Sequence, residues 1–287
     1  MTADDDAVDV ILPTHARPHT VGYAIAAVLR QTHPRLTLHV VGDGCDEATA
    51  AAVGACGDPR LRFHRLPKAP GYGYANRNRV LRQSTAPLVA YASDDDLWFP
   101  DHLARALAVL RDDRVQLSLG REIAVQPPDR VDPYFFAFDW RLGGAGAFLR
   151  HWFTGPGVVV HRRTLFDVIG YWNEALLRFG DREFLSRARA KGVRCASHGD
   201  ATLLRFYAAV WDAQYPQCSV PPQARFLERL ADPRWCAALA EATRPGRRPR
   251  AVRRRQLTDF AAFARRSGPK FARFCYERWR SDGNHDA

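Results

Sequence analysis

Apolar runs and helix-like stripes alternate over the first part of the chain. VDVILPT is an apolar, β-branched run closed by a proline and a threonine, which predicts a buried strand. After it, apolar side chains recur at the spacing of a helix that packs one face on a sheet, at Val21, Ala24, Ile25, Val28 and Leu29. The same alternation continues through LTLHVVGDG, EATAAAVGAC, LRFHRL, GYGYANRNRVLRQS and PLVAYAS. The pattern therefore predicts an α/β fold, in which helices flank both faces of a mostly parallel sheet.

Short polar clusters follow three of the predicted strands directly. They are Thr14 to Arg17, Asp43 to Asp46, and Asp94 to Asp96. In a parallel sheet the carboxyl ends of the strands share one edge, and ligands bind outside that edge. We therefore expect all three clusters to open on one edge of one sheet.

The pattern changes after the predicted helix DHLARALAVLR. VQLSLGREIAVQ and GVVVHR predict further strands, and RTLFDVIG predicts a short helix. DREFLSRARAKG predicts a longer helix whose Phe184, Leu185 and Ala188 face the core. From about residue 213 the strand signals cease, and segments such as QLTDFAAFARR and KFARFCYERWR predict amphipathic helices. The chain is therefore expected to end in a helical extension.

Composition narrows the class of protein. With 46% hydrophobic and 11% aromatic residues, the chain can bury a substantial core. No run of about 18 uncharged apolar residues occurs, and the start MTADDDAVDV is acidic, so we expect a cytoplasmic protein. The six cysteines show no CxxC pair and no zinc-finger spacing, which predicts reduced thiols rather than a sulfur-based metal site.

The net charge of +11 is concentrated near the C-terminus. RPGRRPRAVRRR, residues 244–255, holds seven arginines and no acid. Arginines beside amphipathic aromatic helices suit an anionic membrane surface or another polyanion such as nucleic acid. We therefore expect peripheral membrane or polyanion contact through residues 244–280, with solvated arginines and packed aromatics as the alternative.

Three adjacent aspartates, Asp94, Asp95 and Asp96, follow the fourth predicted strand in YASDDDLWFPDHL. Two unit charges about 4 Å apart repel by roughly 1 kcal/mol in water and about 4 kcal/mol at the effective dielectric of a protein surface. A Mg²⁺ or Mn²⁺ ion would relieve that repulsion, since it binds one or two carboxylates together with waters and phosphate oxygens. The alternative is that the aspartates cap the helix beginning near Pro100, although Asp101 would serve as well.

Three segments resemble the family 2 glycosyltransferases, in the family's order. They are VDVILPTHARPHTVGYAIAAVLRQTHPRLTLHVVGDGCDEAT, GYGYANRNRVLRQSTAPLVAYASDDDLWFPDHL and GPGVVVHRRTLFDVIGYWNEALLRFGDREFLSRARAKGVR, which together span about residues 8–195. The resemblance implies a GT-A fold, inverting chemistry and a divalent cation. It divides a catalytic domain, residues 1–212, into a Rossmann-like nucleotide-sugar half, residues 1–112, and an acceptor half, residues 113–212. Residues 213–287 would form the basic helical extension.

The resemblance also implies roles for individual residues. Asp43 matches the aspartate that binds the nucleotide base, Arg77 matches an arginine near the base or diphosphate, and Asp181 matches the general base. Asp94 and Asp96 are implied as the metal ligands. The implied substrate contacts are Pro13, Thr14, Arg17, Asp43, Arg77, Asp94, Asp95, Trp172 and Glu174.

The chain departs from the family pattern at three positions. Gly42 replaces an aspartate common before Asp43, Asn173 replaces one common before Glu174, and Gly180 stands where an acid often precedes the base. Glu183 is a second candidate for the base. Asp181 could also be the N-cap of its helix, because aspartate is a preferred cap.

The sequence thus predicts a metal-dependent inverting glycosyltransferase that uses a nucleotide-diphosphate sugar. Uracil is favoured because an aspartate can accept its ring N–H, although thymine and guanine offer one too. The acceptor is unassigned, and aromatic residues between 126 and 156 are candidates for its surface or for core, namely Tyr134, Phe135, Phe136, Trp140 and Trp152. Two alternatives are a nucleic-acid-binding protein with a structural acidic loop and a nucleotidyltransferase. The first lacks an RRM, KH or helix-turn-helix signature, and PTHARPHT lacks the glycines expected of the second.

Overall fold

The computed structural model of the chain describes residues 5–126, 130–132, 155–206 and 221–242. The chain divides into two compact units, residues 1–243 and residues 244–287, and the described residues all belong to the first. The arginine-rich run and the five aromatic residues proposed for an acceptor surface lie outside the described residues.

Strands and helices alternate through the first ninety or so residues, as the sequence predicts. The elements are β1 (Val8–Thr14), α1 (Val21–Leu29), β2 (Leu36–Asp43), α2 (Glu47–Gly54), β3 (Leu61–Leu66), α3 (Tyr74–Gln83) and β4 (Leu88–Tyr91). Strands β1 to β4 run parallel to one another, with β1 between β2 and β4. The α/β fold is therefore confirmed.

The second part of the described chain adds antiparallel pairs. Its elements are β5 (Leu97–Trp98), α4 (His102–Leu110), β6 (Leu117–Gln126), β7 (Arg130–Asp132), the 3₁₀ turn η1 (Pro156–Val158), β8 (Val159–Arg162), α6 (Leu165–Ile169), α7 (Gly180–Ala190), β9 (Cys195–Phe206), α9 (Gln223–Arg229) and α10 (Pro233–Ala242). The strand order is β3-β2-β1-β4-β8-β6-β9-β5, with β7 paired to β6. Strand β8 runs antiparallel to both β4 and β6, and β6 runs parallel to β9.

Two strands of this sheet carry no clear signal in the sequence. Polar residues, including His198 and Asp200, interrupt the apolar pattern of β9, which also shifts register against β6. Strand β5 has only two residues and directly follows the three aspartates. Both strands depend on pairing with distant segments, so neither periodicity nor propensity reveals them.

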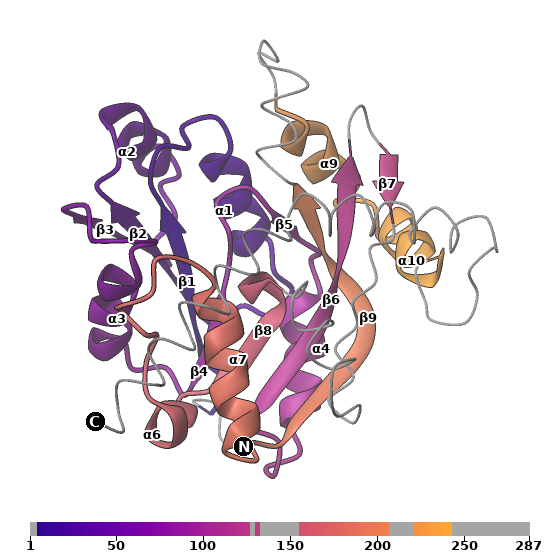
Figure 1. The fold of residues 1–287 in the computed structure, drawn as a ribbon. Coiled ribbons are helices and arrows are strands. Elements are labelled where there is room, and N and C mark those ends of the chain that lie inside the picture. Colours follow the sequence, from indigo (N-terminus) through magenta and orange to yellow (C-terminus); the bar gives the residue numbers. More distant parts are fainter. Residues whose placement is uncertain (1–4, 127–129, 133–154, 207–220, 243–287) are drawn as a thin grey trace, which may run out of the picture. The chain divides into compact units, whose positions relative to one another are not determined.

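The sheet is covered on both faces, because successive residues of its strands point to opposite sides. Val10 and Leu12 of β1 pack in one core cluster with α1, α2 and α4, whereas Ile11 packs in a second with α3, α6 and α7 (Figure 1). The predicted core residues of α7, Phe184, Leu185 and Ala188, are buried in the second cluster.

Helices α9 and α10 pack beside the far end of the sheet. Phe226, Leu227 and Leu230 share a third core cluster with Phe99 and Ile123. The predicted domain boundary after residue 212 stays a prediction, since residues 207–220 lie outside the described residues. Among the helices that the structure describes, none is both long and apolar enough to cross a membrane.

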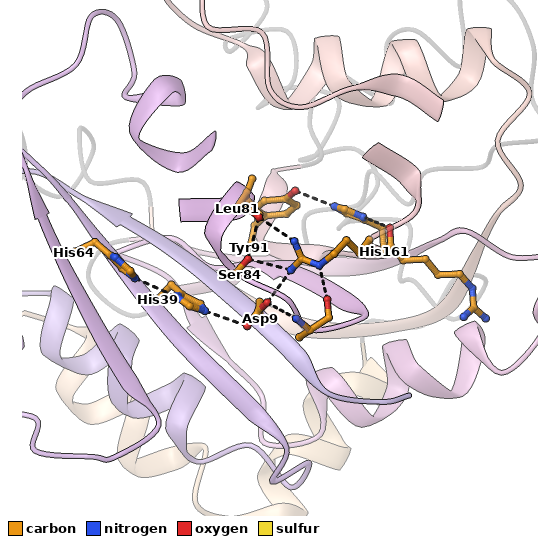
Figure 2. Close-up of polar contacts among 10 residues, drawn as sticks. Asp9, His39, His64, Leu81, Ser84, Tyr91 and His161 are labelled. Carbon is orange, nitrogen blue, oxygen red and sulfur yellow. Dashed lines mark hydrogen bonds and ion pairs between the residues drawn. The ribbon is translucent and has the colours of Figure 1, made fainter. Parts of the chain in front are cut away.

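A buried polar network ties four segments of the sheet together (Figure 2). Asp9 of β1 is 4% exposed and accepts hydrogen bonds from His39 Nε2 at 3.0 Å and from the Ala86 backbone N–H at 2.8 Å. Arg163, which follows β8, donates to the same carboxylate at 2.7 Å. His64 Nε2 lies 3.0 Å from Nδ1 of His39. This network links β1 to β2, to the turn before β4 and to the end of β8.

Candidate active site

The carboxyl ends of β1, β2 and β4 form the edge at which the predicted polar clusters meet. Thr14 ends β1 opposite Gly42, and Asp43 ends β2. Thr14 and Asp43 are 3% and 6% exposed, so both side chains are set into the sheet rather than on a mobile loop. The three aspartates follow β4, whose strand runs parallel to β1.

The aspartates crowd negative charge into a half-buried loop. Burial raises the pKa of Asp94, against the Thr14 hydroxyl and the charge of Arg17, which lower it. Burial and then repulsion by its two neighbours raise the pKa of Asp95 well above its usual range. The pKa of Asp96 rises to about 7, again through burial. The repulsion predicted from sequence is therefore present at this loop.

The loop does not cap the next helix. Helix α4 begins at His102 with Asp101 before it, and Asp101 pairs with Arg105 instead of accepting a capping hydrogen bond. Asp96 Oδ1 accepts a hydrogen bond from the backbone N–H of Phe206 at 2.9 Å. Asp96 is thus anchored to β9 through Oδ1.

The donor set suits a hard divalent cation. Within the described ranges, no three His, Cys, Asp or Glu side chains form a complete cage for a metal. A Mg²⁺ ion needs no such cage, because it keeps waters and takes one or two carboxylates plus substrate phosphates. Adjacent carboxyls with raised pKa values fit that requirement, since a cation would stabilise their ionised forms.

Asp43 is already bound by three donors. Its Oδ1 accepts from the Ala69 backbone N–H at 2.8 Å and from Asn76 Nδ2 at 2.7 Å, and its Oδ2 accepts from Lys68 Nζ at 2.5 Å. Burial opposes ionisation, but these bonds outweigh it and lower the pKa of Asp43. A carboxylate has about four acceptor sites, so one remains on Oδ2.

Packing explains why glycine precedes Asp43. A Cβ at Gly42 would lie 2.9 Å from Cys45 Sγ and 3.0 Å from the ring of Phe63. The aspartate common in the family therefore has no room here. The departure is a consequence of the neighbouring side chains.

Arg77 of α3 lies among the other candidate residues. Its Nη2 donates to the Tyr72 carbonyl oxygen at 3.0 Å, and its Cζ lies 4.9 Å from the ring centre of Tyr74. Burial lowers the pKa of Arg77, while the charges of Asp181, Asp43 and Asp94 act in the opposite direction. The guanidinium of Arg77 thus interacts electrostatically with the predicted base-binding, metal-binding and general-base residues.

Asp181 lies in the first turn of α7 but does not cap it. The N-cap is Phe179, which has a φ of 63°, and helix α7 begins at Gly180. Phe179 is the one non-glycine residue with positive φ in the part of the chain that the structure describes. Such strain is found disproportionately at functional sites. The capping interpretation of Asp181 is therefore wrong.

Tyr74 positions the start of α7. The Gly180 backbone N–H donates to the Tyr74 hydroxyl at 2.8 Å, and a Cβ at Gly180 would lie 2.6 Å from the Tyr74 ring. An acidic side chain at this position would clash with that ring. The departure at Gly180 thus has a steric cause.

The sequence profile described as Glycosyl transferase family 2 matches residues 9–168, which is more than half of the chain. The chain belongs to glycosyl transferase family 2.

Known family relatives are similar over part of their length. UDP-Glc:alpha-D-GlcNAc-diphosphoundecaprenol beta-1,3-glucosyltransferase WfgD of Escherichia coli is 26% identical over 117 residues, which are 41% of this chain and 46% of that protein. An uncharacterized glycosyltransferase of Rickettsia bellii is 29% identical over 116 residues, 40% of this chain and 16% of that protein. This chain thus spans less than half the length of these relatives.

Solved structures share the GT-A fold of this family 2 chain. S. aureus TarS residues 1–349 in complex with UDP-GlcNAc superposes with a TM-score of 0.59 at 16% identity, over 78% of this chain and 70% of that one. The mannosyltransferase PcManGT of Pyrobaculum calidifontis, in complex with GDP-Man and Mn²⁺, superposes with a TM-score of 0.55 at 22% identity, over 90% of this chain and 80% of that one.

The second candidate base in this family 2 chain is held in an ion pair. Glu183 accepts from Arg187 at 2.6 Å and 3.0 Å, and Arg187 also donates to the carbonyl oxygen of Tyr171 at 2.8 Å. Glu183 thus fixes α7 to the segment before it. Asp181 as the general base stays a prediction.

Trp172 is buried against α3, whereas Glu174 is exposed to solvent and hydrogen-bonds to the same helix. Asn78 accepts from the Trp172 backbone N–H at 3.1 Å and donates to the Trp172 carbonyl oxygen at 2.7 Å. Asn78 also donates to Glu174 at 2.8 Å, and the Trp172 side chain is only 3% exposed. Substrate contact by Pro13, Trp172 and Glu174 stays a prediction.

Several residues around the site escaped sequence reasoning. Lys68 and Asn76 bind Asp43, and Arg205 lowers the pKa values of Asp95 and Asp96 while pairing with Glu122 at 2.5 Å. Lys68 and Asn76 lie in the quoted family segment GYGYANRNR or just before it, so their polarity near the loop was a usable signal. Arg205 comes from the unpredicted strand β9, and no local pattern marks it.

Proposed function

We propose that this chain is a metal-dependent, inverting glycosyltransferase that moves a sugar from a nucleotide-diphosphate donor, with UDP favoured, to an acceptor hydroxyl. The observation that carries the proposal is the position of Arg77. The negative charges of Asp43, Asp94 and Asp181 all interact with its guanidinium. Those three carboxylates are the candidates for binding the base, the metal with the donor sugar, and the acceptor proton. One compact site would thus hold every group that the transfer requires.

The donor end of the site is supported by both chemistry and relatives. Asp43 keeps one acceptor position, which suits the ring N–H of uracil. The E. coli relative is named for UDP-Glc, and TarS was solved with UDP-GlcNAc, whereas PcManGT was solved with GDP-Man. We favour UDP on these grounds and treat GDP as the competing donor nucleotide.

Asp94 and Asp96 would hold the Mn²⁺ or Mg²⁺ ion. When bound, the ion would stabilise the negative charge that develops on the leaving diphosphate. Asp95 would bind the donor sugar, and Arg17 and Arg77 would add positive charge beside the diphosphate. PcManGT was solved with Mn²⁺, which supports the choice of cation.

Asp181 would act as the general base. Its carboxylate would accept the proton of the acceptor hydroxyl while that oxygen forms a bond to the anomeric carbon, and the bond to the diphosphate oxygen would break. A single displacement inverts the anomeric configuration and needs no covalent intermediate. Thr14 and Pro13 would line the nucleotide side of the cleft, with Trp172 and Glu174 beside the acceptor.

Replacing Asp181 with Asn tests the proposal most directly. We expect binding of the active nucleotide sugar with Mn²⁺, measured by calorimetry, to persist while turnover falls by about 10²-fold to 10⁴-fold. Glu183→Gln is the matched control on the same turn and should lose far less activity. Normal turnover in the Asp181 variant, or a larger loss in the Glu183 variant, would remove Asp181 from its assigned role.

The donor is found by screening nucleotide sugars for hydrolysis in the presence of Mn²⁺, because this needs no acceptor. A thermal shift with UDP plus Mn²⁺, compared with DNA alone, separates the transferase from a nucleic-acid-binding protein. Family membership already favours glycosyl transfer over nucleotidyl transfer. Cytoplasmic location stays a proposal. Contact of residues 244–280 with a membrane or polyanion is also a proposal, and vesicle sedimentation would test its membrane part.

A further inference from the structure

Four aromatic rings form a column that runs from the core to the surface. Their order is Phe184, Trp172, Tyr74 and Tyr72, with centroid separations of 4.8, 5.9 and 6.5 Å and interplanar angles of 21°, 12° and 24°. The three inner residues are at most 3% exposed, whereas Tyr72 is 56% exposed. The column therefore ends in an aromatic face that meets solvent.

The loop that carries Tyr72 is tightly held. Lys68 Nζ donates to the carbonyl oxygens of Ala69 and Gly71 at 2.8 and 3.2 Å, as well as to Asp43. Arg77 binds the carbonyl oxygen of Tyr72 itself. The exposure of Tyr72 is therefore built into the loop, and it does not result from loose packing.

A second exposed apolar side chain lies next to this loop. A Cβ at Gly71 would come 2.8 Å from the Leu176 carbonyl oxygen and 3.2 Å from Leu177 Cα, so the two backbones touch. Leu177 is 59% exposed, and the Arg178 guanidinium lies 6.0 Å from the ring centre of Tyr72. The described ranges contain one further exposed large apolar residue, Val168, at 46%.

The column is joined to the start of α7. The Tyr74 hydroxyl accepts from the Gly180 N–H, and Asp181 is the next residue. Residues 176–179 lead into the same turn. The exposed ring of Tyr72 is therefore connected through Tyr74 to the turn that carries Asp181.

We propose that Tyr72 is the platform for the sugar ring of a carbohydrate acceptor, with Leu177 nearby and the Arg178 guanidinium over the ring. A pyranose presents a face of C–H groups that packs on the negative face of an aromatic ring, while its hydroxyls remain free for polar partners. Arg178 can donate hydrogen bonds to those hydroxyls. This inference rests on the proposed function, because it assigns the acceptor class to the same site.

The contacts favour the acceptor over the nucleobase of the donor. Tyr72 stacks on Tyr74, which holds Gly180, and Gly71 packs on the segment that precedes Asp181. Both connections lead to the turn that carries the predicted general base, while Lys68 also joins this loop to Asp43, the predicted base-binding residue. A nucleobase on Tyr72 is the competing outcome of the test.

The test measures saturation-transfer NMR contacts between the full chain, with UDP and Mn²⁺ present, and methyl glycosides of glucose, galactose, mannose and N-acetylglucosamine. We expect at least one glycoside to contact the protein through its ring C–H protons. Tyr72→Ala should weaken that binding by about threefold to tenfold, whereas Tyr72→Phe should retain it. Val168→Ala, which trims another exposed apolar residue, should change nothing.

Each other outcome overturns the inference in a distinguishable way. If Tyr72→Ala weakens UDP binding in calorimetry and spares the glycosides, Tyr72 is a nucleobase platform. If the wild-type chain binds UDP but no glycoside, or if Tyr72→Ala binds glycosides normally, the acceptor platform is wrong and the proposed function stands. If the wild-type chain binds no nucleotide with Mn²⁺, the proposed function fails together with the inference.

Discussion

At the scale of single residues, two of the three departures from the family pattern are explained by neighbouring side chains. Gly180 is required because the Tyr74 ring occupies the volume of a side chain there, and Gly42 is required by Cys45 and Phe63. None of these three residues is adjacent in sequence to the glycine that it contacts. Substitution at such positions therefore changes a contact between elements.

Gly180→Ala should disturb the turn that carries Asp181. The new Cβ would lie 2.6 Å from the Tyr74 ring, so the ring or the helix start must shift. We expect lower kcat for donor turnover and a loss of about 1–3 kcal/mol in the free energy of unfolding, measured by urea denaturation. Gly22→Ala in α1, with nothing within 4 Å of the new Cβ, is the control and should be neutral or stabilising. Equal effects of the two substitutions would contradict the steric explanation.

Binding of Mn²⁺ should weaken as the pH falls below about 7. The pKa of Asp96 is raised to about 7, so protons compete with the ion for its carboxylate below that pH. We expect the Kd for Mn²⁺, from calorimetry, to rise by up to about tenfold per pH unit toward acid.

Asp96→Asn should bind Mn²⁺ more weakly and should show a flatter dependence of the Kd on pH. Asp112→Asn is the control, because Asp112 pairs with Arg114 at an exposed turn. A Kd for the wild-type chain that stays constant from about pH 8 to about pH 6 would rule out Asp96 as a ligand.

At the scale of elements, the polar network around Asp9 joins strands that are distant in sequence. Asp9 binds His39 of β2, the Ala86 N–H before β4 and Arg163 after β8. Arg163 also donates to the carbonyl oxygens of Ala86 and Leu81, at 2.5 and 2.9 Å. The junction between the parallel strands and β8 thus depends on one carboxylate.

Asp9→Asn should loosen that junction. The substitution keeps the shape but leaves Arg163 without its buried counter-charge, which costs about 3 kcal/mol of unfolding free energy in comparable cases. Asp58→Asn removes a similar arginine pair at the surface and should cost less than about 1 kcal/mol. Denaturant midpoints compare the two, and matching losses would show that the network contributes no more than a surface pair.

Periodicity predicted the elements whose residues pack on the nearby sheet, such as α1, α3 and α7. It did not predict β9, because polar residues and a register shift break its pattern, and it did not predict that β8 separates β4 from β6. Asp43, Asp94 and Asp181 stand out as acids after strands or in a helix start, whereas Lys68, Tyr74 and Arg205 gain their roles only through tertiary contact. Such contacts leave no local trace in a single sequence.

At the scale of the whole molecule, the described core contains buried neutral histidines. His161 is 0% exposed, and burial lowers its pKa to about 4. Its Nδ1–H donates to the Arg162 carbonyl oxygen at 2.7 Å, and its Nε2 accepts from the Tyr91 hydroxyl at 2.9 Å. His102 is also 0% exposed, and burial lowers its pKa to about 3. The folded chain therefore binds fewer protons at these sites than the unfolded chain does in mild acid.

The free energy of unfolding should decrease as the pH is lowered, partly because of His161. An unfolded histidine takes up a proton near pH 6.5, whereas the folded one does so near pH 4, so this contribution is lost as pH falls from about 6.5 to about 4. At about pH 5 the loss is about 2 kcal/mol for this residue. His161→Phe cannot take up a proton and should lose less stability than the wild type between about pH 7.5 and about pH 5.

Comparing the two proteins at each pH cancels the opposite contribution of the acidic loop, whose carboxyls have raised pKa values. Thermal unfolding midpoints would show the difference. Parallel pH profiles for wild type and variant would mean that the pKa of His161 is the same in the folded and the unfolded chain.

The short segment between β4 and β5 has a consequence for the rate of metal binding. Only residues 92–96 separate β4, in the middle of the strand order, from β5 at its end, and β9 grips the last aspartate through Phe206. Because this short loop is held at both ends, it keeps one conformation without a bound ion, and its carboxylates are preorganised. The loop would therefore not need to rearrange when an ion binds. The rate of association would then be limited by loss of the ion's bound waters.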